Sequence, residues 1–208
     1  MVLPAFPNVK NLYIELGEKV GQLDISPLEN LGQLTVFGNA EEIFLPEKLE
    51  SVSTYGEIDL SLFLPCKSIK NIEILGKTDL SALSDFPNLE TVTIRTGECD
   101  LSLLNSADFS KLVLSNIGDE EISAIDGCPV DTLQISDADL SELGIIRRLP
   151  NLEVIFLTVS GGENPFVTTF MTPSEDDLDK LKTPADVSVL KEFIRNGGTV
   201  YLIPDWNR

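Results

Sequence analysis

Apolar residues recur along the chain in the pattern apolar-x-x-apolar-x-apolar, in which the x positions are most often polar. The pattern begins at positions 9, 31, 49, 69, 89, 109, 130 and 152, so the intervals between starts are 22, 18, 20, 20, 20, 21 and 22 residues. Of the 24 apolar positions in these eight copies, only that of Thr54 holds a polar residue. A hexapeptide that returns at an interval near 20 residues indicates a protein built from repeats.

The spacing within each hexapeptide predicts a short strand. Its last two apolar residues are two positions apart, so they point to the same face of an extended chain. One such strand cannot bury its apolar face alone, whereas stacked repeats form a parallel sheet with a continuous core behind it. We therefore expect an α/β solenoid, with a curved parallel sheet on the concave side and short helical turns or loops on the convex side.

An Asp-Leu-Ser triplet marks the convex side of several repeats. Its acidic members are Asp59, Asp79, Asp100 and Asp139. We expect Ser81 to be the N-cap of a helical turn, with Leu80 and Leu83 facing the core. In the first repeat, Pro27 suits the first position of such a turn. We expect each Asp to accept backbone hydrogen bonds or to face water, rather than to bind Ca²⁺, because a column of like charges repels itself.

The segment LDISPLENLGQLTVFGN, residues 23–39, resembles the leucine-rich repeats of bacterial internalins. A wider resemblance to leucine-rich repeats covers residues 9–158, and it implies a leucine-rich-repeat solenoid that binds protein. The internalin-like Asn after the strand is present as Asn39, but Glu57, Lys77 and Gly97 stand at the equivalent positions of later repeats. A role in host-cell adhesion is therefore not carried over from the resemblance.

Two parts are expected in the chain: a solenoid of about eight repeats over residues 1–158, and a C-terminal cap over residues 159–208 that packs on the last repeat. A separate functional module in the second part is the alternative. There we predict a loop-rich segment with a short strand near Phe166–Phe170, followed by a helix and a strand at Thr199–Ile203. The expected helix has Thr183 as N-cap and Pro184 as first residue, carries apolar Val187, Leu190 and Ile194 at i, i+3 and i+7, and stops at Gly197.

The first predicted strand has few residues before it. Its outer edge either stays unpaired, so that a partner strand could extend the sheet, or is covered by the segment Met1–Pro7, which contains two prolines. We expect the segment to cover the edge.

The chain is strongly acidic, with 34 acidic and 15 basic residues and a formal net charge of −19. This charge opposes binding to nucleic acid and to anionic membranes and favours a basic partner, although acidic residues also serve solubility. No signal peptide and no membrane-spanning segment are expected. Cys66, Cys99 and Cys128 form no metal or disulfide pattern, so we expect buried thiols in a reducing compartment, the cytoplasm.

Candidate chemistry is sparse. The chain has no histidine, which removes the commonest general base and metal ligand, and it has no glycine-rich phosphate-binding motif. We expect no enzyme activity, no catalytic residue, no metal and no cofactor. Hydrolysis by a pair of carboxylates is the alternative.

The outward strand positions are the better candidates for a site. We expect a protein-binding surface on the concave face formed by Tyr13, Phe37, Tyr55, Glu73, Leu75, Thr93, Arg95 and Phe156. Phe37, Tyr55 and Leu75 fall on consecutive repeats and predict an exposed apolar row between Glu73 and Arg95. The alternative is that these side chains tuck under the loop after each strand.

Together these features predict a non-catalytic protein-interaction scaffold that binds a protein partner on its concave face. A bacterial immunity or antitoxin-type protein that neutralises a basic toxin is one alternative, and a region of a secreted or surface adhesin is another. The oligomeric state is left open by the sequence.

Overall fold

The computed structural model describes residues 2–16, 20–38, 40–96, 98–136, 140–160, 163–164, 167, 169–182 and 186–205. The chain divides into two compact units, Met1–Phe109 and Ser110–Arg208. Both combine parallel strands with short helices, so the predicted α/β class is confirmed. The division between solenoid and cap after residue 158 stays a prediction.

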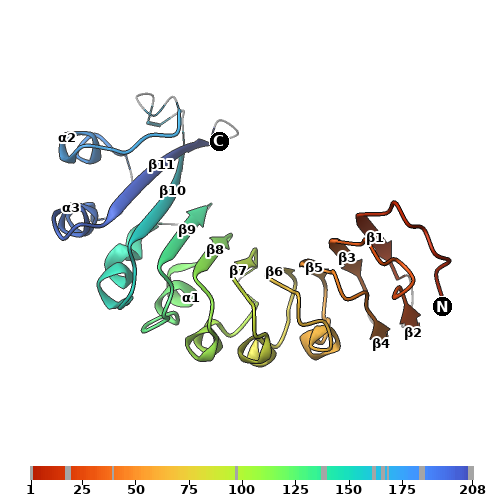
Figure 1. Ribbon diagram of the computed structural model, residues 1–208. Helices are drawn as coiled ribbons and strands as arrows, with labels where there is room; N and C mark the ends of the chain where they lie inside the picture. The colour runs from red at the N-terminus through yellow and green to blue at the C-terminus, as the bar shows by residue number, and fades with distance from the viewer. Residues whose placement is uncertain are drawn as a thin grey trace. The chain divides into compact units, whose positions relative to one another are not determined.

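The first unit contains five parallel strands that pair in chain order (Figure 1). They are β1 (Asn11–Glu15), β3 (Gln33–Phe37), β5 (Ser51–Tyr55), β6 (Asn71–Leu75) and β7 (Thr91–Ile94). The register places equivalent hexapeptide positions side by side, as in Leu34↔Val52 and Val52↔Ile72. The interval between hexapeptides in the sequence thus determines which residues are paired between neighbouring strands.

The core of the first unit lies on one face of this sheet. The paired apolar positions of β3, β5, β6 and β7 are all buried, whereas those of β1, Leu12 and Ile14, are half-buried. Thr54, the one polar residue of the pattern, is fully buried, and its hydroxyl donates a hydrogen bond to the carbonyl of Glu73 at 3.4 Å. That bond offsets part of the cost of burying a hydroxyl group among apolar side chains.

The return side of the coils changes from extended to helical along the first unit. Two short strands, β2 (Val20–Asp24) and β4 (Ala40–Phe44), form a separate parallel pair that the repeat pattern did not predict. The later coils instead carry 3₁₀ helices, which Figure 1 shows in orange to green on the side away from the strands. These are η1 (Leu60–Phe63), η2 (Ser81–Asp85) and η3 (Leu101–Ser106). At Pro27 the chain forms a single hydrogen-bonded turn, in which Leu28 N donates to Ile25 O at 3.0 Å, and no longer helix follows.

The Asp-Leu-Ser triplets cap these turns through their aspartates. Oδ1 of Asp59 and Oδ1 of Asp100 each accept a hydrogen bond from the backbone N–H two residues later, at 2.8 and 3.1 Å, and each Asp is the N-cap. Asp79 accepts the same bond from Ser81 N at 2.9 Å. The assignment of Ser81 as N-cap is wrong, since Leu80 is the N-cap of η2 and Ser81 is its first residue, with its N–H donated to Asp79. Asp139 lies outside the described residues.

The second unit has four parallel strands in the order β8 (Lys111–Ser115), β9 (Thr132–Ser136), β10 (Val154–Ser160) and β11 (Thr199–Asp205). The helices that join them are α1 (Asp119–Ser123), η4 (Leu140–Arg148), α2 (Glu175–Leu178) and α3 (Ser188–Arg195). The strand predicted at Thr199–Ile203 is confirmed as β11, and its residues pair in register with β10 from Val154↔Thr199 onward.

The predicted C-terminal helix is confirmed as α3, with a different start. Its first turn is stabilised by Asp186, whose Oδ1 accepts a hydrogen bond from Ser188 N at 2.9 Å. Gly197, with φ of +97°, follows the helix and confirms the predicted stop. The proposed N-cap Thr183 and first residue Pro184 lie outside the described residues, as does Phe166 of the predicted short strand.

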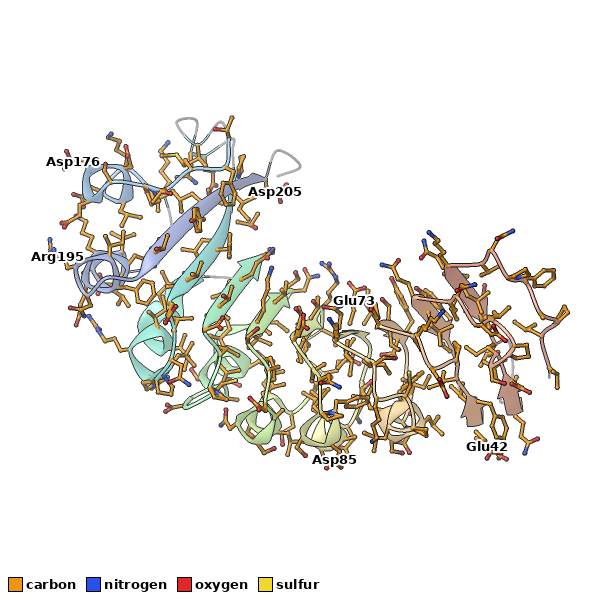
Figure 2. All side chains as sticks on the ribbon, in the orientation of Figure 1. Glu42, Glu73, Asp85, Asp176, Arg195 and Asp205 are labelled. Carbon is orange, nitrogen blue, oxygen red and sulfur yellow. The ribbon has the colours of Figure 1, made fainter. Side chains whose placement is uncertain are left out.

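Helix α2 was not predicted from the sequence, in which its acidic residues indicated a loop. Ser174 and Asp177 form a capping box there, in which each side chain accepts a bond from the other residue's backbone N–H. Arg195 of α3, labelled in Figure 2, donates to Glu175 of α2, with an Nε–Oε1 distance of 2.9 Å. Much of this acidic cluster is thus paired within the second unit.

The three cysteines are buried free thiols, as predicted. Burial raises the pKa of the Cys128 thiol to about 11 and also raises the pKa of Cys99 above its ordinary value. Both thiols are therefore protonated and weakly nucleophilic at neutral pH.

Candidate functional site

The side of the first-unit sheet opposite the core carries most of the predicted site, and we call it the open face. Strand alternation makes every second residue of β1, β3, β5, β6 and β7 point to this face. Figure 2 shows Glu73 at the sheet and Asp85 at the helical side of the coils. Seven of the eight predicted site residues lie on the open face or at its rim: Tyr13, Phe37, Tyr55, Glu73, Leu75, Thr93 and Arg95.

Three of these residues form a row of aromatic rings, in which one pair is stacked and the other is tilted by 42°. The rings of Phe37 and Tyr55, on paired positions of β3 and β5, lie with their centroids 3.7 Å apart and an interplanar angle of 15°. Tyr13 of β1 extends the row at a centroid distance of 4.9 Å from Phe37. We refer to Tyr13, Phe37 and Tyr55 as the aromatic row. Leu75 is the register partner of Tyr55 on β6 and continues it as an aliphatic side chain.

The aromatic row is accessible but unevenly so. The side chain of Tyr13 is 60% exposed, whereas Phe37, Tyr55 and Leu75 are half-buried. These three residues are thus neither a fully exposed row nor side chains fully covered by a loop, which were the two alternatives expected from the sequence. The stacked rings of Phe37 and Tyr55 shield each other's faces, so these two residues offer mainly ring edges to a partner, whereas the tilted ring of Tyr13 is more open.

A charged pair lies beside the row. Arg95 Nε donates to Glu73 Oε1 at 2.6 Å, and Ser53 Oγ donates to Glu73 Oε2 at 2.8 Å. Both carboxylate oxygens of Glu73 thus have a partner on a neighbouring strand or its exit. Thr93 is half-buried on β7 and is the register partner of Glu73. The structure therefore brings the predicted residues together as an apolar row followed by a fixed pair of opposite charges.

Phe156 lies in the second unit, where it belongs to a different cluster. Its ring stacks on Tyr201 of β11 at 5.0 Å, and Phe170 lies 4.8 Å from Tyr201. Lys111 Nζ lies 5.5 Å from the centroid of the Phe156 ring. Tyr201 and Phe170 were not among the site residues predicted from the sequence. A signal for Tyr201 was present, because Val200-Tyr201-Leu202 has the same apolar-x-apolar form as the strands and places Tyr201 at the position of Phe156.

An acidic hollow lies on the return side of the first unit. It has a volume of about 570 Å³, and its lining includes Glu57, Asp59, Asp79, Glu98 and Asp100 together with Lys77. The backbone hydrogen bond from Ser81 lowers the pKa of Asp79, so this carboxylate is charged at neutral pH. Among the described residues, no group of three or more acidic or cysteine side chains is arranged to hold a metal ion. The hollow is an electronegative surface of the coils.

No family model, curated protein or solved structure matches this chain. Within the part of the chain that the structure describes, every helix is too short or too polar to cross a membrane.

Proposed function

We propose that the chain is a non-catalytic scaffold of leucine-rich-repeat type that binds a protein partner on the open face of its first unit. The observation that carries this proposal is the aromatic row of Tyr13, Phe37 and Tyr55, which lies on the face of the first-unit sheet opposite that unit's core. Tyrosine and other aromatic side chains are the residues most often found at the energetic centre of protein interfaces. The close ring contacts support a contact surface that is formed before the partner binds.

The charged pair supports this assignment by adding polar specificity at the rim of the row. The side chains of Arg95 and Glu73 are 45% and 31% exposed, so both are accessible to a partner. Because their mutual bond and the bond from Ser53 fix their orientation, they offer a defined pattern of charge. A partner with a complementary charged side chain would gain little binding free energy from a mobile surface charge. It would gain more from a charge that is already held in position.

A bacterial immunity or antitoxin-type protein that neutralises a basic toxin is the more specific form of this proposal. The net charge of −19 and the acidic hollow favour it, because both attract a cationic protein over a long range. Such a complex forms faster at low ionic strength and weakens as salt is added. This role requires a cytoplasmic protein, whereas a secreted or surface adhesin lies outside the cytoplasm. Fractionation of the native cell distinguishes the two alternatives.

Affinity capture from the native cell tests the proposal when wild type is compared with open-face variants. Tyr13→Ala and Arg95→Ala are the informative variants, since both side chains are exposed and their removal leaves the core intact. Glu90→Ala is a matched control, because it removes an exposed charge just before β7 rather than on the open face. We expect both open-face variants to lose at least tenfold in affinity for the captured protein, measured with purified components, and the control to retain it. Equal binding by all four proteins would refute the open-face site.

A further inference from the structure

The outer edge of β1 carries backbone groups that have no partner among the described residues. Lys10 O accepts a hydrogen bond from Gln33 N at 3.0 Å, and Leu16 N donates to Phe37 O at 2.8 Å, so the even-numbered residues of this strand face β3. Strand alternation then directs the N–H and C=O groups of Asn11, Tyr13 and Glu15 away from β3. Three residues with two groups each give six groups on this edge.

Side chains at this end of the unit are also less covered than elsewhere. Leu12 and Ile14 are half-buried, whereas their register partners Leu34 and Val36 are 1% and 0% exposed. Tyr13, between them on the open face, is 60% exposed. An edge strand that combines unpaired backbone with apolar side chains is a site where another strand adds.

The described residues that precede β1 do not pair with this edge. Val2 forms a parallel bridge with Asp24, and Leu3 N donates to Asp24 O at 3.0 Å, so this segment lies beside the end of β2. The expectation that the N-terminal segment covers the edge of the first strand is therefore not met by the backbone pairing. Phe6 and Val2 are 52% and 69% exposed and add apolar surface at the same end.

We propose that the edge of β1 pairs with β1 of a second copy of this chain, antiparallel, about a two-fold axis at Tyr13. In this register Tyr13 lies opposite Tyr13, Asn11 lies opposite Glu15, and Leu12 lies opposite Ile14 on the core side. All six outward groups of each copy then find partners, because each outward residue faces another outward residue. No like charges are opposed, and the apolar residues of one copy meet those of the other.

The two-fold arrangement closes on itself. Each copy uses its only β1 edge, so the pairing produces a dimer and no filament. The open faces of the two copies become continuous across the axis, and the aromatic row of one copy meets that of the other at Tyr13. The dimer thus doubles the proposed contact surface, although partner binding at the open face does not depend on it.

Charge determines how this dimer responds to salt. Each copy carries a formal net charge of −19, so the two copies repel each other and added salt screens the repulsion. We therefore expect the dimer to be favoured by salt, whereas a complex with a basic partner is weakened by it. This opposite dependence separates failure of the dimer proposal from failure of the proposed function.

Sedimentation equilibrium of the full chain between about 5 and 500 μM, at about 50 and 500 mM NaCl, tests the proposal, since a contact of this small size gives weak association. We expect dimer to form within this range and more of it at the higher salt. Hydrogen exchange of the Tyr13 amide should slow as the dimer forms. A monomer at all these concentrations would overturn the proposal.

Two variants of β1 and one control locate the contact. Tyr13→Lys places like charges opposite each other at the axis, and Asn11→Pro removes an outward N–H at an edge position that tolerates proline. Gln33→Lys adds the same charge on the exposed side chain of the next strand, away from the edge. We expect both edge variants to remain folded by circular dichroism and monomeric, and the control to dimerise as wild type does. A dimer that persists in Tyr13→Lys at the wild-type level would place the contact elsewhere and refute the β1 edge.

Discussion

The ring of Phe37 lies face to face with the ring of Tyr55 on the neighbouring strand, with centroids 3.7 Å apart. Parallel pairing produces this contact, because the register sets Phe37 directly opposite Tyr55. The two residues therefore contribute both to the open face and to the packing of the sheet. A substitution at Phe37 or Tyr55 should therefore change both binding and stability, whereas a substitution at Tyr13 should change binding alone.

Alanine substitutions along the aromatic row should reveal this difference in stability. We expect Phe37→Ala to lower the free energy of unfolding by about 1–2 kcal/mol, less than a fully buried ring because Phe37 is only half-buried. Tyr13→Ala should change it by less than about 0.5 kcal/mol. Urea denaturation measures both, and Phe37→Leu is the control that keeps an apolar side chain. Equal losses of unfolding free energy for Phe37→Ala and Tyr13→Ala would show that both rings contribute equally to packing, and would contradict this prediction.

The Arg95–Glu73 pair should contribute little to folding despite its short contact. Exposed ion pairs are worth less than about 1 kcal/mol, because water screens the charges and two flexible side chains are held in one geometry. We expect Arg95→Ala and Glu73→Gln each to shift the free energy of unfolding within that range, and a double-mutant cycle to give a small coupling that falls with salt. A large coupling that is independent of salt would show instead that the Arg95–Glu73 pair is shielded from solvent and contributes to the stability of the sheet.

The strand register of each unit was predictable from the sequence because it follows from the spacing of apolar residues alone. Positions such as Val52 and Ile72 have the same offset within their copies, and stacking copies of nearly equal length makes them neighbours. The return side was less predictable, since both an extended segment such as β4 and a 3₁₀ turn such as η1 bury their apolar residues against the same core. The choice between them depends on packing between coils, which no local pattern records.

The composition of the candidate site was predictable in part, and its contacts were not. Strand alternation placed Phe37, Tyr55 and Glu73 on one face correctly. The assignment of Phe156 to the same surface rested on equivalence of position and stays a prediction, since this residue lies in the second unit, where it stacks on Tyr201. Ring stacking and the bonds around Glu73 depend on side-chain rotamers, which are determined by neighbours from other repeats.

Two glycines at strand exits should differ in their tolerance of alanine. Gly38 and Gly56 both have a left-handed backbone, with φ of +91° and +90°, so a side chain costs about 1 kcal/mol at either position. A Cβ at Gly38 would also collide with the carbonyl oxygen of Leu16, whereas a Cβ at Gly56 would have no atom within 4 Å. We expect thermal denaturation to show a larger loss of stability for Gly38→Ala than for Gly56→Ala. Equal losses would mean that the Leu16 carbonyl moves aside without cost.

Acid should weaken the capping box of α2 within a defined pH window. The hydrogen bond from the Ser174 side chain, followed by the bond from Lys180, lowers the pKa of Asp177 from 3.8 to about 2. A carboxylate with a lowered pKa in the folded chain stabilises the fold fully above its unfolded pKa, and this contribution is lost as the pH falls towards the folded pKa. The stabilisation by Asp177 is therefore complete above about pH 5 and is lost between about pH 4 and pH 2.

Asp177→Asn isolates this contribution from the other acidic residues. Protonation of the remaining carboxylates also relieves the repulsion of a chain with net charge −19, so the stability of wild type alone does not report on one residue. We expect the variant to be less stable than wild type at pH 7, and the difference between the two melting temperatures to shrink between about pH 4 and pH 2. Asp176→Asn, on the same helix and without a described capping contact, is the control and should show no such convergence. A difference between wild type and Asp177→Asn that stays constant down to pH 2 would mean that the ionised carboxylate does not support the cap.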